Sequence, residues 1–152
     1  MLNNLLARAA EDDNTCICFD YFDTLVTRTV KPEYTKQMAS KLLSLACGGV
    51  VGAGELYGIR RKLEREMCEQ RAAAGGELEF YLPEFAPRFL KKVRDGHQGF
   101  FRGWEPEKFT ELLLDIELTV EKSTQHPLAE VVGVLRELNK REVKTAMISD
   151  FY

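Results

Sequence analysis

The chain opens with an apolar series at helical spacing, followed by a short apolar run. The residues at i, i+3, i+4 and i+7 are Leu2, Leu5, Leu6 and Ala9. This spacing predicts a leading helix over 2–11. The run at 15–19 follows the turn-like letters EDDN and is too short for a helix. It therefore predicts a buried parallel strand that ends at Asp20.

Residues 31–123 are dominated by helical patterns. Three apolar series mark helix faces: Met38, Leu42 and Leu45; Ile59, Leu63 and Met67; and Phe109, Leu112, Leu113, Ile116 and Val120. The glycine-rich letters CGGVVGAG and the pair Gly75 and Gly76 predict where the first two helices end. Pro83 and Pro87 indicate that the segment 80–93 is broken or begins late.

Charged and aromatic residues of this helical region have ordinary interpretations. The run RRKLERE is typical of a solvated helix face with i,i+4 ion pairs. Glu117 and Glu121 share a helix face and are expected at the surface. We interpret the aromatic residues Phe100, Phe101 and Trp104 as packing between helices, in preference to a lid over a substrate.

An alternating α/β pattern returns at the end of the chain. The apolar residues of 128–138 predict a helix, and 143–148 predicts a strand that reaches Ser149 and Asp150. Two similar strands therefore bracket the helical region. Ligands lie beyond the carboxyl ends of parallel strands. If the two strands are neighbours, about 4.8 Å apart, Asp20 and Ser149 converge on one site.

Composition and charge narrow the class of protein. A chain of 152 residues with 45% hydrophobic and 30% charged residues can bury a globular core. The net charge of -3, with both signs mixed, provides no basic stripe for nucleic acid or an anionic membrane. No apolar run reaches the roughly 18 residues of a membrane span, and no secretory signal is evident. We expect a cytoplasmic protein with no nucleic-acid or membrane partner.

The cysteines are interpreted as reduced, buried thiols. They are Cys16, Cys18, Cys47 and Cys68, and no two of them form a C-x-x-C pair. With only two histidines in the chain, their spacing does not favour a zinc site.

The letters FDYFDTLV at 19–26 and AMISD at 146–150 resemble the first two motifs of the haloacid dehalogenase (HAD) superfamily. Those motifs are a strand followed by D-x-D-G-T-L and a strand ending in Ser or Thr. FDYFDTLVTR with the later DIELTVEKSTQHP and ISDFY resembles more narrowly a branch often joined to glycosyltransferases. The resemblance implies an α/β fold: a partial HAD-like Rossmannoid core from 1–30 and 124–152, with a helical cap inserted at 31–123.

The same resemblance implies roles for four residues. Asp20 would be the nucleophile, whose carboxylate forms a covalent intermediate that water hydrolyses. The Asp20 carboxylate and the backbone carbonyl of Phe22 would hold Mg²⁺. Thr24 and Ser149 would supply hydroxyl and N–H donors to the substrate phosphate. From the residues alone, an aspartate after a strand also has the plainer role of capping a turn.

Two positions depart from the pattern of the family. Phe22 stands where the phosphatases carry a second aspartate, and loss of such acid–base help costs about 10²–10⁴ in rate. Dehalogenase members resemble this chain in having an aromatic residue there, because a halide leaves without protonation. Asp23 stands where the family has glycine, and it is either a substitute acid or a loop cap.

The superfamily also requires a lysine and further carboxylates from strands after the second motif. A sheet of two strands lacks independent stability. We therefore expect an N-terminal fragment that is inactive alone, whose missing strands come from the rest of its own longer chain or from a partner such as a glycosyltransferase domain.

Three functions follow as expectations. The first is a Mg²⁺-dependent phosphohydrolase that acts on a small phosphorylated metabolite through an aspartyl-phosphate intermediate. The second is a metal-free, dehalogenase-like hydrolase. The third is a non-catalytic HAD-like module for binding or regulation.

Overall fold

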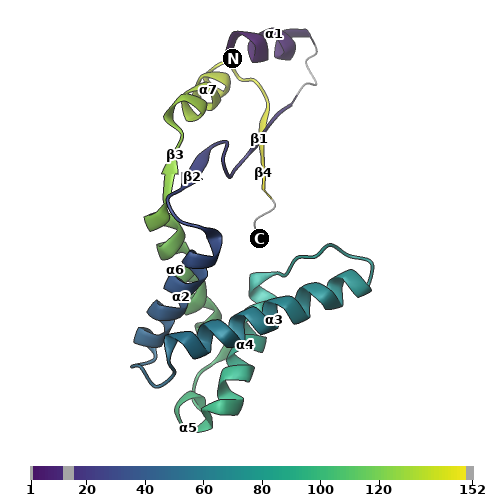
Figure 1. Ribbon diagram of the computed structural model, residues 1–152. Coiled ribbons are helices and arrows are strands. Elements are labelled where there is room, and N and C mark those ends of the chain that lie inside the picture. Colours follow the sequence, from purple (N-terminus) through teal and green to yellow (C-terminus); the bar gives the residue numbers. More distant parts are fainter. Residues whose placement is uncertain (1, 12–15, 150–152) are drawn as a thin grey trace. The chain divides into compact units, whose positions relative to one another are not determined.

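A computed structural model describes residues 2–11 and 16–149, which form a mixed α/β structure that is mostly helical (Figure 1). The chain divides into two compact units. We call the unit formed by the residues up to 29 and from 125 onward the sheet unit. The unit formed by 30–124 is the helical unit.

The sheet unit contains a parallel strand pair. Its elements are α1 (Leu2–Glu11), β1 (Ile17–Asp20), β2 (Val26–Arg28), β3 (Gln125–Pro127), α7 (Ala129–Lys140) and β4 (Thr145–Ile148). β1 and β4 pair in parallel, with Ile17 opposite Thr145 and Asp20 opposite Ile148. The leading helix and the expected proximity of the two strands are confirmed. Thr15, the expected first residue of β1, lies outside the described residues.

Only one face of this strand pair is covered, and it is covered mainly over β1, because Met147 opposite Phe19 is 64% exposed. Phe19 is buried with Leu138 of α7, and apolar residues of α1 and α7 pack against them. Successive strand residues point to opposite faces, so Cys18 and Ile148 share the other face. Both are exposed there. The expectation of buried thiols is therefore wrong for Cys18, and also for Cys16 just before β1.

A second pair of strands lies where the chain leaves and re-enters the sheet unit. β2 and β3 pair antiparallel, with Val26 opposite Pro127 and Arg28 opposite Gln125. The sequence does not predict this pair, because each strand has only three residues and one of them ends in proline. The pair brings the two connections to the helical unit side by side.

Four long helices of the helical unit enclose one core. Its helices are α2 (Pro32–Ala46), α3 (Ala53–Ala73), α4 (Leu82–Gly96), α5 (Gln98–Phe101) and α6 (Pro106–Thr124). α2 and α4 each pack on both α3 and α6 (Figure 1). As expected, α3 ends just before Gly75, whose φ of +83° suits glycine. α4 begins late, with Pro83 in its first turn, and continues through Pro87.

Aromatic rings fill much of this core. Phe89 and Phe109 are buried with their ring centroids 6.1 Å apart. Phe101 is also buried, and its ring centroid lies 5.3 Å from that of Trp104. This geometry confirms the interpretation of Phe101 and Trp104 as packing residues.

The buried face of α2 differs from the expected one. Ala39, Ser40 and Leu43 are buried, whereas Leu42 and Leu45 are 36% and 66% exposed. Ser40 donates a hydrogen bond to the Lys36 carbonyl at 2.9 Å, so its hydroxyl is satisfied within the helix. Small residues such as Ala39 and Ser40 allow neighbouring helices to approach closely, and Leu42 and Leu45 lie outside.

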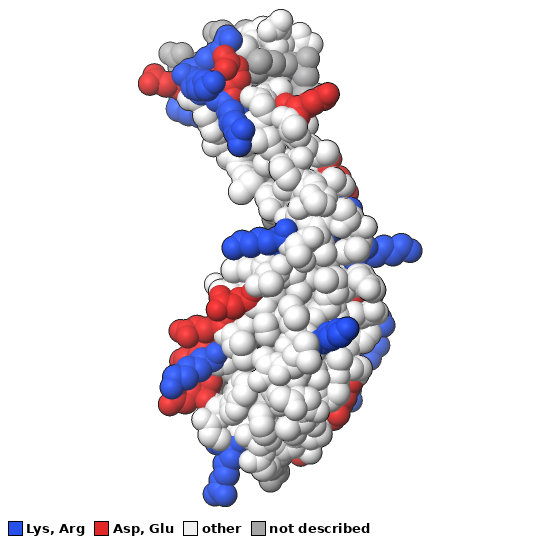
Figure 2. Space-filling view, turned by 90° about the vertical axis from the view of Figure 1, so that its left-hand side faces the viewer, with Lys and Arg blue, Asp and Glu red and all other residues white. Residues whose placement is uncertain are grey.

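The surface shows no stripe of one charge on the side drawn in Figure 2, where basic and acidic side chains are interspersed and much of the helical unit is uncharged. Exposed leucines contribute to the uncharged surface of α2 and α6: Leu42, Leu45, Leu114 and Leu118. Within 2–11 and 16–149, no helix has the length and apolar character needed to cross a membrane.

Candidate functional site

Asp20 is the last residue of β1 and is exposed at the carboxyl end of the strand pair. The Tyr21 N–H donates to Asp20 Oδ1 at 2.7 Å and to the Ile148 carbonyl at 3.2 Å. These bonds fix the orientation of the carboxylate and tie the residue after β1 to the end of β4. Ser149 follows β4 directly, so Asp20 and Ser149 reach the same edge of the sheet. Asp150 lies outside the described residues.

The chain then turns in a tight loop. The Tyr21 carbonyl accepts hydrogen bonds from the N–H groups of Leu25 and Val26, at 2.9 and 3.0 Å. Asp23 donates its N–H to the Val26 carbonyl at 2.7 Å and has a φ of +56°. Asp tolerates this left-handed conformation better than most residues do. Thr24 lies in the same loop and is half-buried.

Tyr21 anchors this loop to β3. Its hydroxyl donates to Gln125 Oε1 at 2.9 Å, and its ring packs against the buried cluster around Phe19. The sequence does not identify Tyr21 or Gln125 as site residues, because 104 positions separate them. The anchor orders the loop that follows Asp20.

Arg28 lies over Phe22, which is a second feature that the sequence does not predict. The guanidinium carbon of Arg28 is 3.8 Å from the centroid of the Phe22 ring. The Tyr21 ring meets Phe22 edge-on at 4.9 Å. The only sequence signal was a basic residue shortly after the first motif. The structure thus brings a cation to the loop that carries Asp20.

The loop after β1 carries no closed metal site. Among the described residues, no group of three or more His, Cys, Asp or Glu side chains is arranged to hold a metal. Asp20 offers an exposed carboxylate, and Phe22 offers a backbone carbonyl. Mg²⁺ commonly binds one or two carboxylates and completes its shell with water and phosphate oxygens.

A buried charge cluster lies in the helical unit. Arg60 is only 1% exposed, donates through Nε to Glu64 Oε1 at 2.7 Å, and pairs through Nη1 with Glu117. Lys36 Nζ lies 2.6 Å from Glu64 Oε2. The expected i,i+4 pair of the RRKLERE run is confirmed by Arg60 and Glu64, but these two residues are buried and not solvated. The expectation that Glu117 and Glu121 are surface charges is wrong.

Arg60 remains charged in this cluster. Burial opposes the charged guanidinium, but the carboxylates of Glu117 and Glu64 outweigh it and hold the pKa of Arg60 above its ordinary value. Arg60 Nη2 is buried without a hydrogen-bond partner among the described residues. Because the cluster joins α2, α3 and α6, we interpret it as part of the core of the helical unit.

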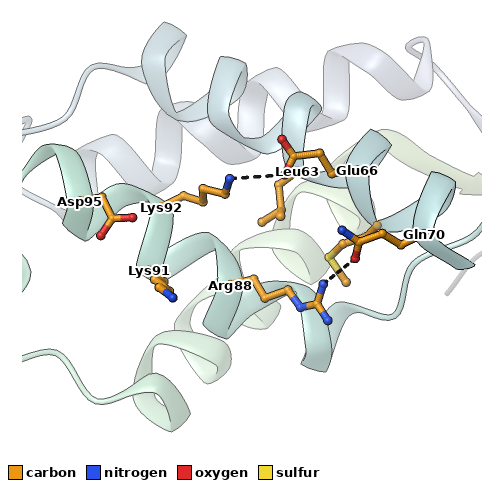
Figure 3. A pocket seen from close by; sticks show the side chains of 8 residues that line it. Leu63, Glu66, Gln70, Arg88, Lys91, Lys92 and Asp95 are labelled. Carbon is orange, nitrogen blue, oxygen red and sulfur yellow. Dashed lines mark hydrogen bonds and ion pairs between the residues drawn. The ribbon is translucent and has the colours of Figure 1, made fainter.

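A groove of about 440 Å³ lies between α3 and α4 (Figure 3). Lys92 Nζ lies 3.3 Å from Glu66 Oε2, and Arg88 donates to Gln70 Oε1 at 3.1 Å. Leu63 contributes to its apolar floor. Its charged residues thus mainly link the two helices, and no arrangement of catalytic groups is present in it.

No protein-family model matches the chain, and no curated protein has a significantly similar sequence.

Proposed function

We propose that Asp20 is the nucleophile of a Mg²⁺-dependent, HAD-like phosphohydrolase. The observation that carries this proposal is the exposed carboxylate at the carboxyl end of β1, beside β4 and the residue Ser149. This is the edge at which parallel sheets bind ligands. The substrate class is a small phosphorylated metabolite, and the intermediate is an aspartyl phosphate.

The residues of the loop would act together in this reaction. Asp20 attacks phosphorus through one carboxylate oxygen, while the N–H of Tyr21 holds Oδ1 in place. The bond from phosphorus to the leaving oxygen breaks, and that oxygen takes its proton from solvent, because Phe22 cannot donate one. Water later hydrolyses the aspartyl phosphate to inorganic phosphate and the free Asp20 carboxylate. Thr24 and Ser149 would donate hydrogen bonds to phosphate oxygens. Mg²⁺ would be held by the Asp20 carboxylate and the Phe22 carbonyl, where it would neutralise phosphate charge.

We further propose that the sheet unit is part of a HAD-like Rossmannoid core at 1–30 and 124–152, with a cap at 31–123. The sheet of only two strands supports the addition of further strands at its edges, and the uncovered face that carries Cys18 and Ile148 supports further helices over it. The rest of a longer chain or a glycosyltransferase domain would supply them. Free thiols at the surface are consistent with the reducing cytoplasm.

A metal-free hydrolase that attacks carbon is the second candidate. Phe22 favours it, because a phenyl ring cannot protonate a leaving oxygen, whereas a halide leaves without a proton. The same residue is compatible with a non-catalytic binding or regulatory module. The response to a phosphate mimic separates these candidates from the phosphohydrolase.

Thermal unfolding of the full-length protein with Mg²⁺ and beryllium fluoride tests the proposal. Binding at about 100 times the dissociation constant stabilises a protein by about 2.7 kcal/mol, so we expect a rise in melting temperature of roughly 5–10 °C. Asp20→Asn should abolish the rise, and Asp95→Asn, an exposed site in the helical unit, should retain it. Absence of a rise in the unsubstituted protein would contradict the phosphohydrolase.

A further inference from the structure

Large apolar side chains are exposed together on two neighbouring helices of the helical unit. α2 and α6 pack against each other and run in opposite directions (Figure 1). Leu42 and Leu45 of α2 are 36% and 66% exposed, and Leu114 and Leu118 of α6 are 44% and 45% exposed. Residues three or four positions apart are neighbours on a helix surface, so each helix presents a pair of adjacent leucines. We call these four leucines the α2–α6 face.

The inner side of α2 shows that its exposed leucines are not needed to fill the core of the unit. Apart from Leu43, the helix buries small residues such as Ala39 and Ser40, whereas Leu42 and Leu45 lie outside. Single exposed leucines are ordinary on a protein surface, but a contiguous apolar patch marks an interaction site. We therefore expect a partner to cover the α2–α6 face.

Exposed charges of both signs border this face. Lys41 lies beside Leu42 on α2, and Lys122 lies one turn after Leu118 on α6. Glu111 and Asp115 each precede a leucine of α6 by three residues, and acidic side chains gather at one edge of the uncharged surface in Figure 2. In the part of the chain that the structure describes, none of these four charged residues belongs to an ion pair. They are therefore available to a partner.

We propose that a second copy of this chain binds at the α2–α6 face. Dimers of one protein are commonly two-fold symmetric, so that the same surface of each copy meets its own equivalent. A two-fold axis parallel to the two helices places α2 of one copy over α6 of the other. The leucines of the two copies then cover one another. The basic side chain Lys41 of each copy faces the α6 edge that carries Glu111 and Asp115 in the other.

The balance of charge at the border favours a second copy over a partner with a strong charge of one sign. A basic partner would be repelled by Lys41 and Lys122, and an acidic partner by Glu111 and Asp115. A second copy carries the same balanced border, so charges of opposite sign can meet. The inference is independent of the proposed function, because neither Asp20 nor its loop belongs to the face.

Sedimentation velocity of the complete protein at roughly 1 to 100 μM tests the inference. We expect an equilibrium between monomer and dimer. Leu45→Asp places a charge among the apolar side chains of the interface, so it should raise the dissociation constant of the dimer at least about tenfold. Because Leu45 is 66% exposed, the substitution should leave the circular dichroism spectrum unchanged.

Leu78→Asp is a matched control. Leu78 is 71% exposed between α3 and α4, outside the α2–α6 face. The substitution introduces the same charge on the helical unit and should leave the dissociation constant of the dimer unchanged.

Exchange of charges tests how the two copies are arranged. Lys41→Glu should raise the dissociation constant by about threefold or more, because each border contact occurs twice in a two-fold dimer. Addition of Asp115→Lys should recover part of that loss, since the exchanged charges again have opposite signs.

A complete protein that stays monomeric at all these concentrations overturns the inference. A dimer that Leu45→Asp leaves intact also overturns it, because the copies then meet through another surface. If Leu45→Asp dissociates the dimer but the exchange of charges recovers nothing, the placement of α2 over α6 is wrong.

Discussion

At the scale of single residues, the backbone of Asp23 gives the clearest indication of its role. Its φ of +56° lies in the left-handed region, and its N–H closes the loop onto the Val26 carbonyl. Glycine has no steric cost in this conformation, whereas alanine does. This loop geometry alone is sufficient to explain an aspartate at position 23. The alternative is that Asp23 acts as an acid or base.

Substitution of Asp23 separates the two roles. Asp23→Ala should lower the free energy of unfolding by about 1 kcal/mol, because a β-carbon without a local polar group is unfavourable at positive φ. Asp23→Gly should preserve or raise that free energy. Urea denaturation of both variants measures the difference.

The proposed phosphatase activity, measured on the complete protein, provides the second readout. If Asp23 only shapes the loop, Asp23→Gly keeps its turnover. A loss of about 10²–10⁴ in turnover, with stability intact, would show instead that Asp23 donates or accepts a proton.

At the scale of helices and strands, α3 shows how much the sequence can predict. Its apolar stripe and its end before Gly75 follow from spacing and glycine chemistry. The burial of Arg60 was detectable in principle, because Arg60 lies at i+4 from Leu56 and i−3 from Leu63, within the stripe. The pairing of Arg60 with Glu117 could not be predicted from the sequence, since 57 positions separate the two residues.

Removal of Glu117 should destabilise the helical unit strongly. Glu117→Ala leaves the buried Arg60 guanidinium with Glu64 as its remaining close acidic partner. Loss of one partner from a buried ion pair costs about 3–5 kcal/mol, and we expect a value near the lower limit because Glu64 remains. Chemical denaturation followed by circular dichroism measures the loss.

The exposed Glu111 of the same helix provides a matched control. Glu111→Ala should change the free energy of unfolding by less than about 0.5 kcal/mol. Equal effects of the two substitutions would contradict a stabilising role for the buried pair.

At the scale of the whole molecule, the two units differ in how completely each one buries its apolar core. The helical unit buries a continuous core between its four long helices. The sheet unit buries Phe19, Leu25 and Leu138 on one side of a strand pair and leaves the other side open. The alternation of helices and strands predicts the pairing of β1 with β4. It does not predict β2 and β3, whose pairing depends on the return of a distant segment.

The candidate site is likewise predictable from the sequence only in part. The position of Asp20 after an apolar strand follows from the sequence, and so does its proximity to the end of β4. The Arg28–Phe22 stack and the Tyr21–Gln125 hydrogen bond depend on the β2–β3 pair. Sequence spacing therefore identifies the proposed nucleophile, and tertiary structure is needed to find the residues that surround it.

The central claim is that Asp20 becomes covalently phosphorylated. Its most direct test is to treat the complete protein with Mg²⁺ and acetyl phosphate, reduce it with borohydride, and map the modified residue by mass spectrometry. An acyl phosphate on Asp20 would be reduced to homoserine, and we predict this product at position 20 and its absence from Asp20→Asn. Homoserine at Asp23 instead, or at no aspartate of the loop, would contradict the assignment of Asp20 as the nucleophile.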